Sequence, residues 1–500
     1  MSPPNAEQAG EVSFSFTVSG LPSDTFHVQD FVGEEELNGD FVFRLTLLSR
    51  STTLKPADLP GRDASFFIES RREGLPVKIP THGMVGEFGV VRQIFERVEY
   101  RATLIPRLAR LNISEYSEIY SLEKSASGIL EEVLKEAGFT SRDYQFKIVD
   151  EGRPRSFVCQ YRESPRHFLD RWAEREGIVY LFDHSGEKEK VVFYDQPHQK
   201  PAWTKSLNYR PPGELDVGFF DDTLIEFTEM AYPVPGKAIV QDFNYRKANL
   251  EIRQEEVLDP RLETLVEEEG INLRTNAEAK RQVKILAESL RCRSRIFSGT
   301  STAIEIRVGT TVSVGNHFLE SLNGSFFVYR VKFEGMMGND ILGNSMGAGA
   351  AQQARFTARF EAIPADVPFR PERRTPWPKI AGVVQGIVEA EGSGKLAEVN
   401  EYGEYKVRFP FALTRKKVQK GSGWVRLSTP LAGSDNGIHF PLHKETEVLV
   451  AFLGGDPDQP VIVGALHNSE GRNLVTNKNP EMNLIRSAGG HFILFNDGNL

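Results

Sequence analysis

The segment Gly392-Ser393-Gly394-Lys395 is the one most suggestive of phosphate chemistry, because its glycines and lysine resemble part of a phosphate-binding loop. Such a loop requires Ser or Thr directly after the lysine, and this chain has Leu396 there. It also requires an opening glycine at position 389, which is Glu389. We therefore interpret the segment as an ordinary barrel loop and predict no cofactor.

Two histidines, His439 and His443, have the spacing that would place two metal ligands on one face of a helix. Pro441 lies between them in strand-like surroundings, and no third ligand is near in sequence. Without a helix the spacing has no meaning, so we predict no metal site. The remaining histidines that could act in catalysis are scattered and accompany no nucleophile motif: His82, His167, His184 and His198.

Two runs of glutamates could provide the acid and base of a cell-wall hydrolase, namely Glu34-Glu35-Glu36 and Glu267-Glu268-Glu269. Consecutive acidic residues usually form a solvated face, and this catalysis needs two carboxylates in different environments so that their pKa values separate. Cys159 and Cys292 lie in no CxxC or nucleophile motif, so we interpret them as buried, reduced thiols. The sequence predicts no catalytic residue.

A basic loop could neutralise nucleic-acid phosphates, since it contains Arg415, Lys416, Lys417 and Lys420. It lacks the aromatic side chains on which single-stranded bases stack. The formal net charge of the chain is −9, whereas nucleic-acid binders are usually basic. We predict no nucleic-acid partner and favour a rim contact to a neighbouring subunit.

The elements that carry this loop are five short segments of strand-like pattern between Ile380 and Gly464. Their number and length are typical of an OB-type barrel, and glycines near Ile380 allow the bends that closure requires. We expect seven residues to form the core of this barrel: Val407, Phe409, Trp424, Val448, Val450, Phe452 and Ile462.

The part before the barrel is rich in short strands, including one predicted at Ile304 to Val308, and contains three helices. Ser125 or Ser127 caps the first helix, Asn276 is expected to cap the third, and Gly335 to Ala351 reads as a projecting loop. The second helix has the clearest boundaries: Ser164 at the N-cap, Pro165 at the first position and Gly177 beyond the end.

Five hundred residues exceed what one core organises, which predicts several domains. We expect a flexible lead at 1–10, a β-rich domain at 11–362, a proline-rich linker at 363–378, the barrel at 379–466, and a neck with further strands at 467–500. The first residues do not resemble a signal peptide, and no run approaches the ~18 apolar residues of a membrane span. The chain is therefore expected to fold in the cytosol and to be carried if it leaves the cell.

Three strings in the barrel region, in this order, resemble the OB domain of the VgrG family of type VI secretion spikes: YKVRFPF at 405–411, GWVRL at 423–427 and EVLVAFLGGDPDQPVIVG at 447–464. The segment 157–182 resembles the hub domain of the same family, with its strand, Arg-Glu-Ser turn, helix and aromatic strand. Residues 482–497 resemble the first strands of the family's needle. Members normally continue beyond the position of Leu500, so a truncated chain is expected.

The resemblance implies a mainly β fold: a β-rich α+β hub with barrel-like subdomains, an OB-fold barrel, and the start of a trimeric β-prism needle. It implies a homotrimer that caps the hexameric Hcp tube, carries a PAAR-type tip protein and effectors at the missing end, and punctures a target membrane. The protein would fold in the bacterial cytoplasm and then be injected. The alternatives are the baseplate hub of a contractile phage tail and an effector-bearing, cell-wall-degrading spike.

Overall fold

The structure is a computed structural model that describes residues 12–72, 75–120, 123–196, 199–210, 222–338, 354–390, 394–412 and 423–498. Several sequence predictions fall outside these ranges: the lead at 1–10, His198, Gly392 and Ser393, the basic loop at 415–420, and most of the predicted loop at 335–351. None of the helices in the described ranges is both long enough and apolar enough to cross a membrane.

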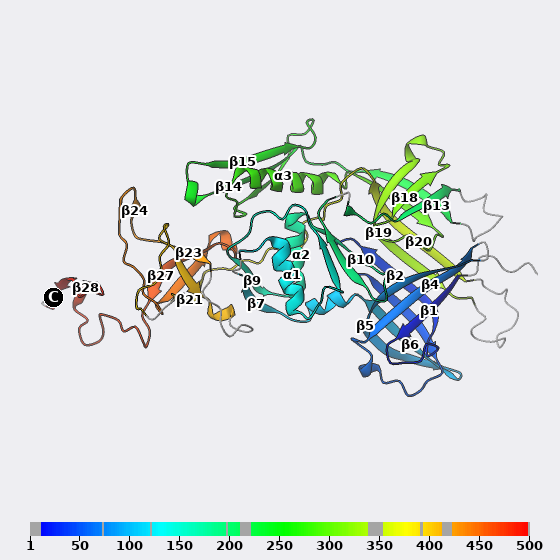
Figure 1. Cartoon of the computed structure of the whole chain (residues 1–500), viewed down its shortest axis with the longest axis horizontal. Helices are drawn as coiled ribbons and strands as arrows, with labels where there is room; N and C mark the ends of the chain where they lie inside the picture. Colours follow the sequence, from blue (N-terminus) through cyan, green and yellow to red (C-terminus); the bar gives the residue numbers. More distant parts are fainter. Residues whose placement is uncertain are drawn as a thin grey trace, which may run out of the picture.

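One continuous sheet of twelve strands forms the wide end of the molecule (Figure 1). Its first half has the strand order β1-β4-β5-β6-β3-β2. Alternate residues point inward as the pattern of apolar residues predicts, so that Phe14, Phe16 and Val18 of β1 are buried. The bounds of these strands are β1 (Val12–Val18), β2 (His27–Glu36), β3 (Val42–Ser49), β4 (Asp63–Arg72), β5 (Leu75–Ile94) and β6 (Arg97–Ile105).

The second half of the sheet closes on itself, because β20 pairs with both β17 and β19. The ring runs β19-β18-β12-β13-β17-β20, and β19 also joins β2 of the first half. The chain thus contains two groups of six strands that meet at the β2–β19 seam. The bounds are β12 (Thr204–Tyr209), β13 (Thr223–Ala231), β17 (Arg295–Ser301), β18 (Thr311–Gly315), β19 (Gly324–Met336) and β20 (Arg355–Pro364).

Two predictions in this region are wrong. Residues 304–308 form turns and irregular backbone, although Ile304, Ile306 and Val308 are buried and so give the apolar alternation typical of a strand. Gly335 belongs to β19 and does not begin a loop. An added Cβ at Gly335 would lie 2.1 Å from the ring of Phe31, so glycine is needed for this close approach inside the sheet.

A mixed layer of helices and short strands lies between the large sheet and the opposite end of the molecule (Figure 1). One part contains α1 (Ala126–Glu136), α2 (Pro165–Glu176), β7 (Tyr116–Tyr120), β8 (Tyr144–Lys147), β9 (Val158–Glu163), β10 (Val179–Asp183) and β11 (Lys190–Tyr194). The other packs α3 (Asn276–Arg291) on a sheet of β14 (Lys237–Phe243), β15 (Glu251–Val257) and β16 (Leu265–Glu269).

The predicted caps of the first two helices are confirmed. Ser125 accepts a hydrogen bond from the Gly128 N–H at 3.2 Å, and Ser164 accepts one from the His167 N–H at 3.1 Å. The cap predicted for the third helix is wrong by one residue. Thr275 Oγ1 accepts from the Glu278 N–H at 3.2 Å, whereas Asn276 is already helical and its amide bonds to Glu251 O.

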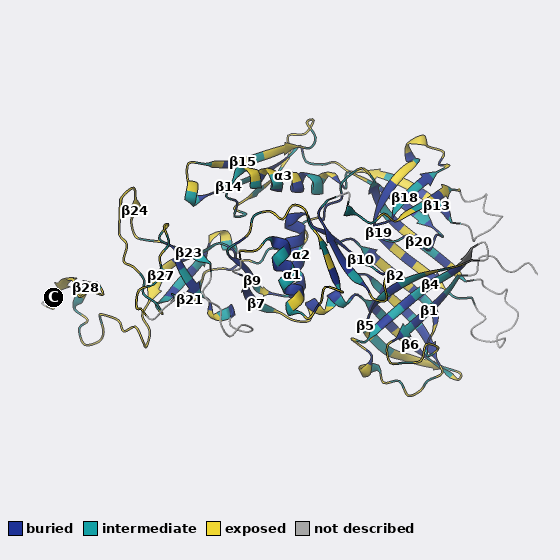
Figure 2. Ribbon diagram, in the orientation of Figure 1, coloured by how far each residue is buried: buried dark blue, intermediate teal, exposed yellow. Residues whose placement is uncertain are grey.

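The five predicted barrel strands form a closed barrel in the order β21-β22-β23-β27-β26. Their bounds are β21 (Val383–Glu389), β22 (Tyr405–Arg408), β23 (Trp424–Leu427), β26 (Glu447–Phe452) and β27 (Pro460–Leu466). Two small hairpins are separate from the barrel sheet. One, β24 (Ala432–Gly433) with β25 (Asn436–Gly437), is inserted between β23 and β26, and the other, β28 (Met482–Arg486) with β29 (Phe492–Asn496), follows the barrel. Buried residues concentrate in the large sheet, the helices and the barrel, while the last hairpin is largely exposed (Figure 2).

Candidate functional site at the junction of body and barrel

Helix α2 positions most of the charged side chains at the junction between the body, residues 12–364, and the barrel, residues 380–466. Pro165 occupies its first turn, where a missing N–H has no cost, and Gly177 ends it in the left-handed conformation at φ 68°. Unusually for so polar a sequence, five of its charged residues are buried: Arg166, Arg171, Glu174, Arg175 and Glu176. The helix is therefore a charged element inside the molecule, where each ion needs a partner.

Arg171 and Glu163 form the most deeply buried ion pair of the junction. The guanidinium donates to both carboxylate oxygens of Glu163, with N–O distances of 2.8 to 3.1 Å, and to Cys159 O at 3.0 Å. The side chains are 0 % and 4 % exposed. This fork geometry compensates two desolvated charges, and the loss of Glu163 would leave the buried Arg171 charge without its ion-pair partner.

The barrel meets this cluster through the turn between β26 and β27. The Cys159 N–H donates to Asp458 Oδ1 at 2.6 Å, and the Trp377 indole N–H donates to Asp456 Oδ1 at 3.0 Å. Burial, followed by the charge of Asp456, raises the pKa of Asp458 to about 7. A carboxylate of the barrel is thus fixed by a backbone donor of the body.

The junction also has an apolar part. Phe157, Cys159 and Ile119 of the body belong to the same buried cluster as the barrel core. The ring of Phe157 lies 6.0 Å from that of Phe409, measured between centroids. Because the barrel and the β7–β9 pair share one core, the two parts are packed together and are not merely tethered.

The proline-rich segment is held against the body by Arg370. Its guanidinium donates to Gly177 O at 2.8 Å, to Asp195 O at 2.6 Å and to Glu288 Oε2 at 2.8 Å. Thr375, further along, donates to both oxygens of Glu174 at 2.9 and 2.7 Å. The segment therefore connects α2, α3 and the barrel as a strap with fixed contacts.

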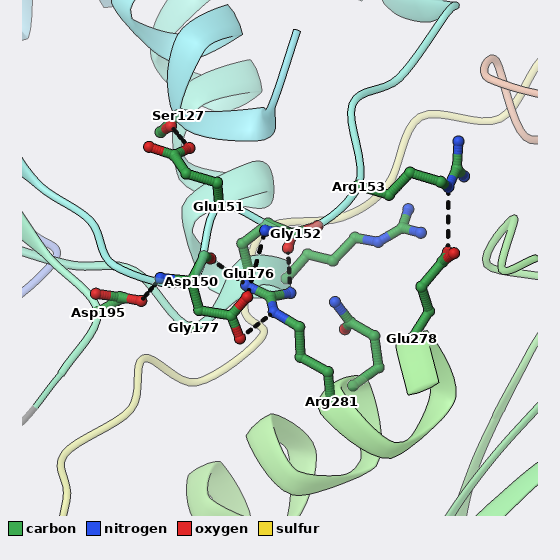
Figure 3. Close-up of polar contacts among 12 residues, drawn as sticks. Ser127, Asp150, Glu151, Gly152, Arg153, Glu176, Gly177, Asp195, Glu278 and Arg281 are labelled. Carbon is green, nitrogen blue, oxygen red and sulfur yellow. Dashed lines mark hydrogen bonds and ion pairs between the residues drawn. The ribbon is translucent and has the colours of Figure 1, made fainter. Parts of the chain in front are cut away.

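A second charged network joins α3 to the loop before β9 (Figure 3). Arg281 of α3 contacts Asp150 at 2.7 Å and Glu176 at 2.5 Å, and Arg153 contacts Glu278 at 3.2 Å. These pairs link three segments that are distant in sequence. They fix α3 with its sheet relative to α2.

Six of the seven residues expected in the barrel core are buried in one cluster: Val407, Phe409, Val448, Val450, Phe452 and Ile462. The expectation for Trp424 is wrong, since this side chain is only partly buried and outside the cluster. Trp424 pairs across the sheet with Lys406, while its neighbour Val425 pairs with Tyr405 and points inward. Residues on a strand alternate between faces, so only one of the two neighbours can fill the core.

The residues first considered for chemistry have structural partners. Glu35 is buried against Arg307, Glu268 pairs with Arg373, and His439 Nε2 lies 3.1 Å from the Tyr405 hydroxyl. Within the described ranges, no group of three or more His, Cys, Asp and Glu side chains could hold a metal ion. Both cysteines are buried and free, as predicted, and burial raises the pKa of each thiol: Cys159 and Cys292.

No pattern in the sequence indicated that arginines would gather at the junction. Arg155, Arg175 and Arg370 lie in polar segments that read as solvated surface, and their burial depends on elements far away along the chain. The only available signal is the presence of Trp172 and Trp377, since tryptophan faces attract guanidinium groups. The Arg155 and Arg175 guanidinium carbons lie 5.0 and 5.1 Å from the Trp172 ring centroid.

Family models match most of the chain. The model for the phage tail baseplate hub (GPD) matches residues 34–339, and that for the type VI secretion system/phage-baseplate injector OB domain matches residues 394–467. The second match begins inside the barrel region and ends just after β27. Both ends of the junction described above therefore lie in recognised domains.

Curated relatives match nearly the whole chain. The chain is 26 % identical over 483 residues to the type VI secretion system spike protein VgrG3 of Vibrio cholerae, and 28 % identical over 475 residues to VgrG1c of Pseudomonas aeruginosa. These matches cover 92 % and 90 % of the chain, but 45 % and 61 % of the relatives. The actin cross-linking toxin VgrG1 of Vibrio cholerae is 27 % identical, with 42 % of its length covered. The chain thus spans about half the length of these relatives.

Solved structures support the fold. The E. coli c3393 protein, a component of the type VI secretion system, superposes with a TM-score of 0.65 at 20 % identity, over 90 % of this chain and 99 % of that one. The lidded PdpA-VgrG complex of Francisella gives a TM-score of 0.65 at 10 % identity, over 98 % and 76 %. Taken with the match of the hub model over more than half of the residues, the chain belongs to the phage tail baseplate hub (GPD) family, in the VgrG type that joins this hub to an OB domain.

Proposed function

We propose that this protein is the spike and hub of a type VI secretion system, acting as a homotrimer and as a mechanical component without catalysis. The relatives named as spike proteins of such systems support this, because the chain matches them across hub and OB domain. The toxin activity in the name of one relative belongs to a protein of more than twice the matched length.

Hairpin β28–β29 is the observation that carries the proposal. Ile485, Phe492 and Phe495 are 52 %, 62 % and 63 % exposed, on a two-stranded hairpin at the end of the molecule farthest from the large sheet (Figure 1). Such a hairpin has marginal stability in water, and its apolar side chains require cover. Three copies around one axis would bury these side chains and pair the free strand edges, which gives a shaft able to transmit force without fraying.

The opposite end of the molecule suits a ring-shaped partner. Each chain has two groups of six strands in the large sheet, so three chains would present six such groups. This number supports docking on a hexameric Hcp tube ring. A PAAR-type tip protein and effectors would then bind beyond the hairpin, and the assembly would fold in the cytoplasm and be driven into the target membrane.

Mass photometry of the purified chain tests the proposal directly. We expect particles of three times 56.2 kDa. Phe492→Ser should weaken the trimer, whereas Phe95→Ser, at an even more exposed phenylalanine in the body, should not. A wild-type protein that stays monomeric at micromolar concentration would contradict the proposal, as would a zymogram showing cell-wall hydrolysis. Neighbouring genes for Hcp and an ATPase, as opposed to capsid genes, distinguish this role from that of a phage tail hub.

A further inference from the structure

Residues 428–442, which connect β23 to β26, form an arm that projects from the barrel. Every residue from Leu431 to Phe440 is exposed, as Figure 2 shows around β24. The short strands β24 and β25 fold the arm into a hairpin, in which the Ile438 N–H donates to Leu431 O at 3.0 Å. A two-stranded hairpin of this length has little stability of its own in water. A surface that lies against the arm would hold it in this shape.

The arm has the composition of a contact surface. Leu431, Ile438 and Phe440 are 56 %, 44 % and 55 % exposed. Leu431 and Ile438 lie opposite one another in the hairpin, so their side chains project to the same side. Asp435 is the only charged residue at 428–442, although charged residues make up 26 % of the whole chain. Exposed segments are normally rich in charge, whereas the centres of protein interfaces are depleted of it.

The barrel has a second apolar surface, on the outward side of β21, β26 and β27. Residues of β26 alternate between buried and half-buried, and both kinds are apolar from Val448 to Phe452. On the outward side, Ala451 pairs with Val383 of β21 and with Val461 of β27. A sheet that faces water normally has polar residues there. We define the outer face by its apolar side chains: Val383, Ile387, Leu449, Ala451, Val461 and Leu466.

Neither surface is packed into the cores of its own chain. No residue of the arm from Leu431 to Phe440, and none of the outer face, belongs to or packs against a hydrophobic core cluster of the described residues. The only charged residues in β21, β26 and β27 are Glu389 and Glu447, both at strand ends. The barrel therefore has two different surfaces that are both apolar and poor in charge.

Two different surfaces on each chain are what a ring of identical chains requires. In such a ring, one surface of each copy meets the other surface of the next copy. The arm and the outer face both lie on the barrel, and β24 lies toward the same end of the molecule as β28 (Figure 1). That end is where the proposed trimer brings three copies together. An anionic membrane would instead favour lysine and arginine, and residues 428–442 contain neither.

We propose that the arm of one copy lies on the outer face of the next copy's barrel, so that three such contacts join the barrels into a ring. The contact would bury Leu431, Ile438 and Phe440 of one copy against the outer face around Val383 and Leu449 of the next. This rests on the proposed trimer, and it adds the two surfaces through which neighbouring barrels meet.

Disulfide cross-linking in the full chain tests which surfaces meet. Copies with Ile438→Cys, co-expressed with copies with Val383→Cys, should form covalent dimers under mild oxidation, seen on a non-reducing gel. Each variant expressed alone should give none, because an arm meets an outer face and never another arm. Ile113→Cys co-expressed with Val383→Cys is the control, since Ile113 is 81 % exposed on the body and should give no dimer. The native Cys159 and Cys292 are buried, so they do not take part.

Assembly provides a second readout. Phe440→Ser should raise the concentration of half-dissociation about tenfold or more, because this ring is removed from water only in the assembled state. Its exposed position leaves the fold of the single chain unchanged, which an unaltered urea midpoint would verify. Phe95→Ser, at an exposed phenylalanine of the body, should leave assembly unchanged.

Three results would overturn the inference. One is a wild type that assembles while the co-expressed Ile438→Cys and Val383→Cys copies give no covalent dimer, which would leave the trimer proposal intact. Another is a covalent dimer from Ile438→Cys alone, which would place arm against arm. The third is binding of the wild type, and not of Phe440→Ser, to phosphatidylcholine vesicles with no difference in assembly, which would make a lipid surface the partner of the arm. A wild type that never assembles would instead refute the proposed trimer, and the inference with it.

Discussion

Replacing Asp458 by asparagine should change how the stability of the barrel junction depends on pH. Asp458 is 5 % exposed, and its Oδ1 accepts the Cys159 N–H at 2.6 Å. Its Oδ2 has no hydrogen-bond donor among the described residues. An asparagine keeps the oxygen that accepts this hydrogen bond and removes the charge, so the contact between body and barrel is preserved.

The magnitude follows from the pKa of Asp458, which burial raises from 3.8 to about 7. That difference corresponds to about 4 kcal/mol in the free energy of unfolding. Because the pKa is higher in the folded state, this stability is fully present below pH 3.8 and is lost as the pH rises through about 7. Asp458→Asn should remove this loss of stability at high pH. It should lower the free energy of unfolding by about 1 kcal/mol at every pH, because its amide N–H group has no acceptor.

Urea denaturation between pH 4 and pH 9, followed by tryptophan fluorescence, measures the effect. Trp377 bonds to Asp456 at this junction and reports its opening. We expect the wild type to lose several kcal/mol relative to Asp458→Asn as the pH rises from 4 to 8. Asp24→Asn, at an exposed turn, should follow the wild type. If Asp458→Asn gave the same pH profile as the wild type, the argument from burial would be refuted.

Three further substitutions test the junction and the barrel. Val450→Asp in the barrel core should abolish both folding of the barrel and secretion, and intact secretion by this variant would contradict the assignment. Val450→Ala should lower the free energy of unfolding by about 2 kcal/mol. Glu163→Gln should cost about 3–5 kcal/mol, because Arg171 is left as a buried, unpaired charge, and an unchanged urea midpoint would argue against this. Trp424→Ala should lower the free energy of unfolding less than Val425→Ala does in urea denaturation. The reverse order would show that Trp424 belongs to the core.

Local patterns in the sequence predicted the individual elements well. Ser164, Pro165 and Gly177 bounded α2 correctly, since capping and left-handed glycines act within a few residues. The alternation of apolar and polar residues around Val407 and Val450 predicted the barrel strands, because successive side chains of a strand point to opposite faces. The same reasoning failed at Trp424, because only the strand register shows that its neighbour Val425 is the residue that faces the core.

The sequence by itself determined the mainly β fold, the barrel and the likeness to spike proteins, because these depend on short-range periodicity and on strings of neighbouring residues. Only the tertiary structure decided that the polar helix α2 is buried and that Asp458 lies beside Cys159, 299 positions earlier in the chain. It also decided that Arg175 forms no ion pair with the carboxylates of the described residues. The cost or gain of a buried charge depends on what surrounds it in space, and no local pattern records those surroundings.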